Sequence, residues 1–219
     1  MTSDIRGSWW LALLFLLLPG LSGSLPAMGA SPTGDMSELP SRVKQAAERM
    51  AGHPQADTTA QSIVVDVAAQ RLYLFERGAF VADYPVSTAE RGTGNREGSM
   101  QTPLGLHRVA QKFGEDAPVG MIFRGRRSTG EIAEILTDPD QRAQRDDVTT
   151  RILWLDGLEP GVNRGGEVDS KRRYIYIHGT PEEGRIGRPA SHGCVRMTNA
   201  DVIELFDRVE VGALVDIIE

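Results

Sequence analysis

Short hydrophobic runs separated by turn residues are the feature of this sequence that most constrains its fold. Ile63 to Val67 is mostly β-branched, Arg71 to Glu76 alternates polar and apolar residues, and Phe80 to Ser87 again has extended character. Gly78 marks a turn before the third run. Short strands joined by tight connections predict an antiparallel β-meander in this part of the chain.

Strand-like runs continue through the rest of the chain, at Leu106 to Val109, Arg151 to Leu155, Arg173 to Ile177 and Val211 to Ile218. The run that ends at Ile177 is hydrophobic on both faces, which predicts a central strand. A helix with a cap at Thr198 or Asn199 is expected before the last run. The pattern therefore predicts a mainly β, sandwich-like fold with one or two short helices.

The N-terminal part of the chain predicts export. A helix over the apolar run from Trp9 to Leu18 would rise only ~15 Å, half of a ~30 Å hydrocarbon core. Residues 1–30 are therefore interpreted as a secretory signal, with an uncleaved membrane anchor or a buried helix as the alternatives. Residues 31–60 are expected to be a linker with a short helix from Ser41, and residues 61–218 a single domain.

Composition and charge narrow the class of protein. The sequence is 40% hydrophobic and 25% charged, which is ordinary for a folded domain. Its formal net charge of −6 argues against a nucleic-acid-binding protein, which usually carries an excess of lysine and arginine. Cys194 is the only cysteine, so no internal disulfide can form.

The candidate chemistry gathers around Cys194. Two of the four histidines, His178 and His192, fall in the same segment of the sequence as this cysteine. We expect Cys194 to lie in a loop just before a helix, where backbone N–H groups stabilise a thiolate and a developing oxyanion. Gly193 permits a backbone conformation that a side chain would forbid. His178, at a strand end, can accept the thiol proton and return it to a leaving amine.

These residues resemble the signature of the L,D-transpeptidase catalytic domain, the YkuD-like family that cross-links peptidoglycan. The match consists of Ser191-His192-Gly193-Cys194-Val195-Arg196 with His178-Gly179 upstream, and the Thr102-Pro103-x-Gly105 turn belongs to it as well. The resemblance extends over roughly residues 61 to 218. No separate peptidoglycan-binding module is expected, because the segment before the domain is too short for one.

The resemblance implies a two-step acyl transfer without a cofactor. Cys194 would attack the carbonyl after the diamino acid of a tetrapeptide stem, expel D-alanine and form a thioester. His178 would be the proton acceptor and donor, oriented by a backbone carbonyl near Gly179. His192 and Gly193 would shape the oxyanion hole, and Arg196 is assigned to substrate binding or loop positioning. The acceptor would be an amine of a neighbouring stem or of a lipoprotein, in the periplasm or cell envelope.

Other interpretations remain open at this stage. Water as the acceptor would make the protein an L,D-carboxypeptidase, and a wall-binding or redox-sensing protein could keep the fold without turnover. A zinc site built from His178, His192 and Cys194, with His107 as a fourth ligand, has suitable ligand types but unfavourable spacing. Residues 124–150 are expected to form an irregular surface insertion or lid, whose arginines either face solvent or meet substrate carboxylates.

Overall fold

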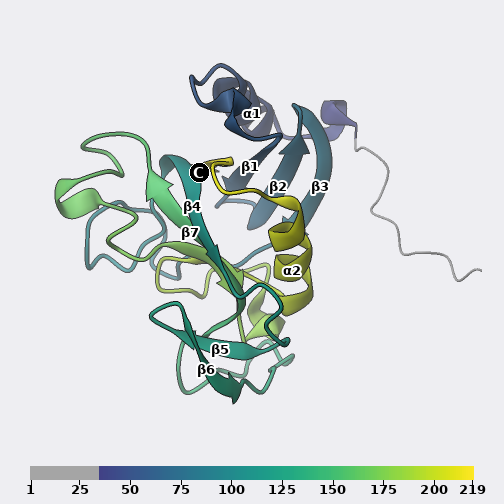
Figure 1. The fold of residues 1–219 in the computed structure, drawn as a ribbon, viewed down its shortest axis with the longest axis vertical. Helices are drawn as coiled ribbons and strands as arrows, with labels where there is room; N and C mark the ends of the chain where they lie inside the picture. The colour runs from purple at the N-terminus through teal and green to yellow at the C-terminus, as the bar shows by residue number, and fades with distance from the viewer. Residues whose placement is uncertain (1–34) are drawn as a thin grey trace, which may run out of the picture.

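A computed structural model describes the structure of residues 35–219 (Figure 1). The predicted secretory segment, residues 1–30, lies outside the described residues, as does the start of the predicted linker. Within residues 35–219, no helix is both long and apolar enough to cross a bilayer.

The described residues form a mainly β structure, as the sequence predicts. Its strands join in one hydrogen-bonded sheet with the order β3-β2-β1-β10-β4-β7-β5-β6, and β8 pairs with both β7 and β9. The strands are β1 (Gln61–Asp66), β2 (Arg71–Glu76), β3 (Ala79–Pro85), β4 (Gly105–Phe113), β5 (Met121–Arg124), β6 (Arg127–Ile132), β7 (Val148–Gly157), β8 (Tyr176–Gly179), β9 (Val195–Met197) and β10 (Leu214–Ile218). The helices are α1 (Ser41–Ala51) and α2 (Asn199–Arg208), with 3-10 turns at Met36–Glu38, Ala56–Thr58, Gly166–Val168 and Glu183–Arg185.

The predicted meander is confirmed, since β1, β2 and β3 pair in antiparallel fashion. The last strand then returns to the middle of the sheet. In β10, Val215 pairs with Ile63 of β1 in parallel and with His107 of β4 in antiparallel register. The C-terminal strand thus joins the meander to the long strands that carry the rest of the domain.

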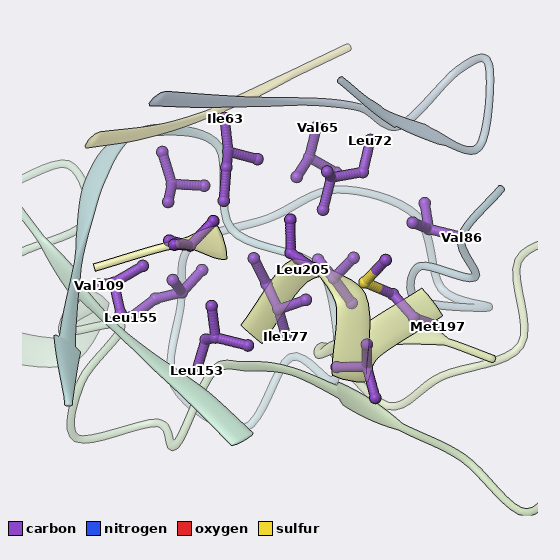
Figure 2. Packing of buried hydrophobic residues seen from close by; sticks show 14 of the residues in the cluster. Ile63, Val65, Leu72, Val86, Val109, Leu153, Leu155, Ile177, Met197 and Leu205 are labelled. Atoms are coloured by element: carbon purple, nitrogen blue, oxygen red, sulfur yellow. The ribbon is translucent and has the colours of Figure 1, made fainter. Parts of the chain in front are cut away.

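The main core is closed by α2 (Figure 2). Side chains from β1 and β2 on one side and from β7 and β8 on the other converge around Leu205 of α2. Leu205 and Val202 are fully buried, and Thr198 caps the helix by accepting a hydrogen bond from the Asp201 N–H at 3.1 Å. Because α2 is packed in this way, the segment that precedes it, with the cysteine, has a rigid support.

The helix in the predicted linker is instead part of the folded domain. Val43, Ala46 and Met50 are buried against β1, β2 and β10. Ion pairs tie the same helix to two inner strands of the sheet, with Arg42 pairing with Asp66 of β1 at 2.6 Å and Arg49 with Asp216 of β10. Ser41 is the first helical residue and not the cap, since Pro40 holds the cap position.

Two other segments differ from the prediction. The strand predicted over Arg173 to Ile177 begins only at Tyr176, because residues 170–175 fold into a turn in which the Ile175 N–H donates to the Ser170 carbonyl. Residues 124–150 are only partly irregular, since β5, β6 and the start of β7 lie in or next to them. The hairpin of β5 and β6 projects at the end of the molecule opposite α1 (Figure 1).

His107, on the central strand β4, holds the turn of residues 170–175 in place. Its ring is fully buried, with Nδ1 2.9 Å from the Gly105 carbonyl oxygen and Nε2 2.9 Å from the Ser170 hydroxyl. Burial lowers the pKa of His107 to about 4, so the ring is neutral at physiological pH. The neutral tautomer donates to Gly105 and accepts from Ser170, which satisfies both nitrogens.

We predict that this histidine makes the fold sensitive to acid. Below its ordinary pKa of 6.5 the unfolded chain binds a proton at His107, whereas the folded chain does so only near pH 4. Folded stability therefore falls as pH drops through this window, and His107 accounts for about 2 kcal/mol of the loss between pH 6.5 and 4.5. In urea denaturation, His107→Asn should flatten the pH dependence by that amount. His53→Asn should keep the wild-type slope, and an equally steep slope in His107→Asn would contradict the assignment.

Candidate active site

The site is organised by the parallel pairing of β8 with β9. Ile177 pairs with Val195 and His178 with Arg196, so Cys194, just before β9, lies beside Tyr176. The Tyr176 N–H donates to the Cys194 sulfur at 3.4 Å, and the thiol donates to the Tyr174 carbonyl oxygen at 3.4 Å. α2 begins at Asn199, as predicted, but the segment between Cys194 and this helix is not all loop, because the three-residue β9 intervenes.

This placement changes the expected state of the thiol. Burial raises the pKa of Cys194 to about 12, against the opposing hydrogen bond from the Tyr176 N–H. The sequence predicts that N–H groups at a helix start stabilise a thiolate at Cys194. Because α2 starts only beyond β9, its positive end does not have that role. The resting sulfur is a protonated thiol at neutral pH, and a base must remove its proton when it reacts.

His178, on the neighbouring strand β8, is the residue expected from the sequence to be that base. It is 2% exposed, and its Nδ1 lies 2.7 Å from the Gly179 carbonyl oxygen. This is the orienting contact that the resemblance implies, and it directs the Nδ1 proton to the carbonyl and leaves Nε2 as an acceptor. Burial lowers the pKa of His178 to about 4, although Asp146 and the Gly179 carbonyl oppose the shift. The ring is therefore neutral at physiological pH.

The thiol and the imidazole share one face of the strand pair. Tyr176 and His178 are two positions apart on β8, so their side chains point to the same side. Their ring centroids are 6.5 Å apart in an edge-to-face arrangement. Cys194, beside Tyr176 in the parallel register, presents its sulfur to that face as well. The arrangement places a partly buried thiol and a neutral imidazole on one face of the strand pair.

Both predicted glycines meet tight backbone constraints. Gly193 has a φ of +131°, a region that favours glycine, and a Cβ there would lie 3.3 Å from the Gln101 carbonyl oxygen. At Gly179 a Cβ would lie 2.6 Å from the side-chain oxygen of Asn199 and 2.9 Å from the Thr149 carbonyl oxygen. Side chains at either position would push the loop and the strand out of register.

A serine that the prediction gave no role closes the cysteine loop. The Ser191 hydroxyl donates to the Cys194 carbonyl oxygen at 2.6 Å and accepts from the Gly193 N–H at 3.2 Å. The Gly193 N–H, expected to face an oxyanion, is therefore engaged within the loop. Thr88 anchors the same loop, since its carbonyl accepts the Ser191 N–H at 2.9 Å.

Asp146 links two of the predicted site residues. Its carboxylate lies 2.6 Å from Nδ1 of His192 and 2.5 Å from the Arg196 guanidinium. Arg196 also pairs with Glu182 at 2.8 Å, and its side chain is only 2% exposed. The expectation that Arg196 contacts substrate is therefore not supported, because its guanidinium is buried between two carboxylates. The geometry fits the other expectation, loop positioning.

Neighbouring side chains stabilise the ionised form of Asp146. Burial opposes its ionisation, but Arg196, His178 and His192 outweigh burial and hold the pKa of this carboxyl below its usual value. The His192 side chain is 60% exposed, so this ring faces outward beside the cysteine loop. Sequence reasoning missed Asp146 because it belongs to the segment expected to be a surface insertion, with no motif around it.

No metal site accompanies this arrangement in the part of the chain that the structure describes. Over residues 35–219, no group of three or more His, Cys, Asp or Glu side chains is arranged to hold a metal ion. His107, the fourth zinc ligand considered from the sequence, instead bonds to Gly105 and Ser170. The described geometry is that of a cysteine–histidine site on a β scaffold, the class of site that thiol-dependent acyl transfer requires.

Comparison with known proteins gives the family. The family model described as the L,D-transpeptidase catalytic domain, YkuD, matches residues 60–217. The chain belongs to the L,D-transpeptidase catalytic domain family. The match covers the whole sheet from β1 onward and includes every site residue predicted from the sequence.

Individual relatives are more distant. The chain is 28% identical over 169 residues to the probable L,D-transpeptidase YbiS of Escherichia coli, covering 74% of this chain and 46% of that protein. It is 26% identical over 165 residues to the probable L,D-transpeptidase ErfK/SrfK of Salmonella typhimurium, with the same coverage of both chains. The chain thus spans about half the length of these relatives. Among solved structures, an L,D-transpeptidase from Xylanimonas cellulosilytica matches at 21% identity and a TM-score of 0.44, covering 80% of this chain and 68% of that one.

We predict that neutralising Asp146 loosens the cysteine loop. Asp146→Asn removes the charge between Arg196 and His192 while keeping the shape, and should lower the free energy of unfolding by about 2 kcal/mol, the usual loss for a hydrogen bond to a charged group. Asp147→Asn is the matched control, since Asp147 pairs only with the 60%-exposed side chain of Arg145. Chemical denaturation checks this. Equal losses in the two variants would remove Asp146 as the specific link.

Proposed function

We propose that this chain is an exported L,D-transpeptidase that forms a cysteinyl thioester with a peptidoglycan tetrapeptide stem and transfers the acyl group to an amine. The observation that carries the proposal is the pairing of β8 with β9, which sets a partly buried thiol beside Tyr176, two positions from a histidine whose Nδ1 is committed to a carbonyl. Family membership supplies the substrate class, and the relatives are probable L,D-transpeptidases by name.

In the first half-reaction, His178 Nε2 takes the thiol proton as the Cys194 sulfur attacks the carbonyl carbon after the third stem residue. The carbonyl π electrons move to oxygen and form a tetrahedral oxyanion. When the oxyanion collapses, the C–N bond to D-alanine breaks and His178 returns its proton to the leaving amine. The product is a thioester on Cys194 and free D-alanine.

In the second half-reaction, an acceptor amine attacks the thioester carbonyl and loses a proton to His178. The C–S bond breaks, and the sulfur regains that proton to restore the resting thiol. A neighbouring stem as acceptor gives a cross-link, and a lipoprotein amine gives protein anchoring. Water gives a trimmed tripeptide stem, which is the carboxypeptidase alternative. Asp146 acts as a positioning residue through His192 and Arg196.

We predict a covalent intermediate on Cys194. After incubation with purified disaccharide-tetrapeptide, intact-protein mass spectrometry should find an adduct of the stem lacking D-alanine, and Cys194→Ala should acquire no adduct and form no product. The product inventory then separates cross-linked dimers from trimmed stems. If the wild-type protein stays unmodified and releases no D-alanine, the non-catalytic alternative replaces this proposal.

We also predict where the acid limb of the acylation rate falls. Since burial lowers the pKa of His178 to about 4, its base form is lost only as pH falls through that value, and the rate should be flat near neutrality. His178→Ala should slow acylation by about 10²- to 10⁴-fold and abolish the limb. His192→Ala should keep the limb, with folding verified at each pH by circular dichroism. An acid limb that persists in His178→Ala and disappears in His192→Ala would assign the base to the other histidine.

A further inference from the structure

Arg126 stands at the tip of the β5–β6 hairpin in a backbone conformation that arginine rarely adopts. Gly125 and Arg126 form the two-residue turn, with φ values of +56° and +65°. Turns of this kind favour asparagine, aspartate or glycine, because a left-handed conformation is costly for other side chains. Local turn chemistry therefore does not account for an arginine here, and strained positions of this type cluster at functional sites.

The Arg126 side chain folds back onto an aromatic platform. Its guanidinium carbon lies 4.3 Å from the centroid of the Trp154 ring and 5.3 Å from that of Tyr174. The guanidinium also donates a hydrogen bond to the Tyr176 hydroxyl at 3.1 Å. Trp154 and Tyr174 are themselves stacked, with ring centroids 6.0 Å apart. These contacts fix the position of the cation.

The Arg126 guanidinium has no carboxylate partner among the described residues. Among residues 35–219, no carboxylate lies within ion-pair distance of this guanidinium, whereas Arg124 on the same hairpin pairs with Glu131 at 3.5 Å. Arg126 meets only ring faces and a phenol. A planar guanidinium that is held in place and lacks an anion is suited to bind a carboxylate through two parallel hydrogen bonds.

The same aromatic residues contact the nucleophile. The Tyr174 carbonyl accepts the Cys194 thiol proton, and the Tyr176 N–H donates to its sulfur. Tyr174 is 54% exposed and also has a left-handed φ of +57°. Arg126 and Cys194 therefore contact the same two tyrosines, the guanidinium through the Tyr174 ring and the Tyr176 hydroxyl, and the sulfur through their backbone groups.

We propose that Arg126 is a specificity-determining residue that binds the carboxylate of the acyl donor nearest to the scissile bond. The inference rests on the proposed function. The bond that breaks there is the last peptide bond of the stem, so the terminal carboxylate lies one residue beyond the attacked carbonyl. If the attacked diamino acid also carries a carboxylate on its side chain, that group is the second candidate. Binding of either carboxylate to Arg126 would position the carbonyl of the scissile bond at the Cys194 sulfur.

The test compares donors and variants together. The donors are a tetrapeptide stem with both carboxylates free, one with a C-terminal amide and one with a side-chain amide. The proteins are the wild type, Arg126→Gln, Arg126→Lys and the control Arg127→Gln, which neutralises the next, exposed arginine of the hairpin. Acylation of Cys194 gives kcat/KM for each pair, and thermal unfolding verifies that each variant is folded.

We expect one of the amides to lower wild-type kcat/KM by about 10- to 100-fold, the size of a lost charge-assisted contact. Which amide does so identifies the carboxylate. For Arg126→Gln, kcat/KM on the free stem should fall by the same factor, and that amide should cause no further loss. Arg126→Lys should recover part of the preference for the free carboxylate. Arg127→Gln should have the same kcat/KM values as the wild type. If Arg126 had only a structural role, Arg126→Gln would lower kcat/KM equally for all three donors.

Two results would count against the inference. If Arg126→Gln still prefers the free carboxylate by the wild-type factor, or if the wild type accepts all three donors equally, Arg126 does not set specificity and the proposed function stands. If none of the donors acylates Cys194 in the wild type, the proposed function fails and this inference fails with it.

Discussion

The pairing of two short strands is the constraint on which the site depends. The three residues of β9 hold Cys194 beside Tyr176 and set Arg196 opposite His178. So few backbone hydrogen bonds cannot fix a strand alone, and the surrounding structure supplies the rest. Buried α2 anchors the C-terminal side of β9, and Ser191 closes the loop on its N-terminal side. The chemistry therefore depends on packing that extends across the whole sheet.

Burial sets the protonation state of the two central groups in opposite directions. It raises the pKa of Cys194 and lowers that of His178, and both shifts favour a neutral pair over an ion pair. The ionic interactions lie one layer further out, where Asp146 and Glu182 enclose Arg196. Charge holds the loop in place, while the reacting atoms rest in an uncharged state until a substrate arrives.

Sequence periodicity was sufficient for the parts of the fold where an element spans several residues. The meander, α2 with its Thr198 cap and the presence of a last strand all follow from patterns that the structure confirms, whereas the position of that strand between β1 and β4 does not. The three-residue β9 is too short to produce a period, so the segment between Cys194 and the helix cap was interpreted as loop. Asp146 and Arg126 carry no local motif, and only the folding of distant segments onto the cysteine loop reveals their neighbours.

The raised pKa of the Cys194 thiol also affects how readily the resting protein reacts with oxidants. Peroxides and disulfides react with thiolates far more readily than with thiols, so a sulfur that stays protonated until its base acts is a poor target for either. Outside the reducing interior of a cell, an exposed thiolate would soon be oxidised or capped. The burial that delays ionisation therefore also protects the sulfur from oxidants, which matters in a chain whose one cysteine has no partner thiol to repair it.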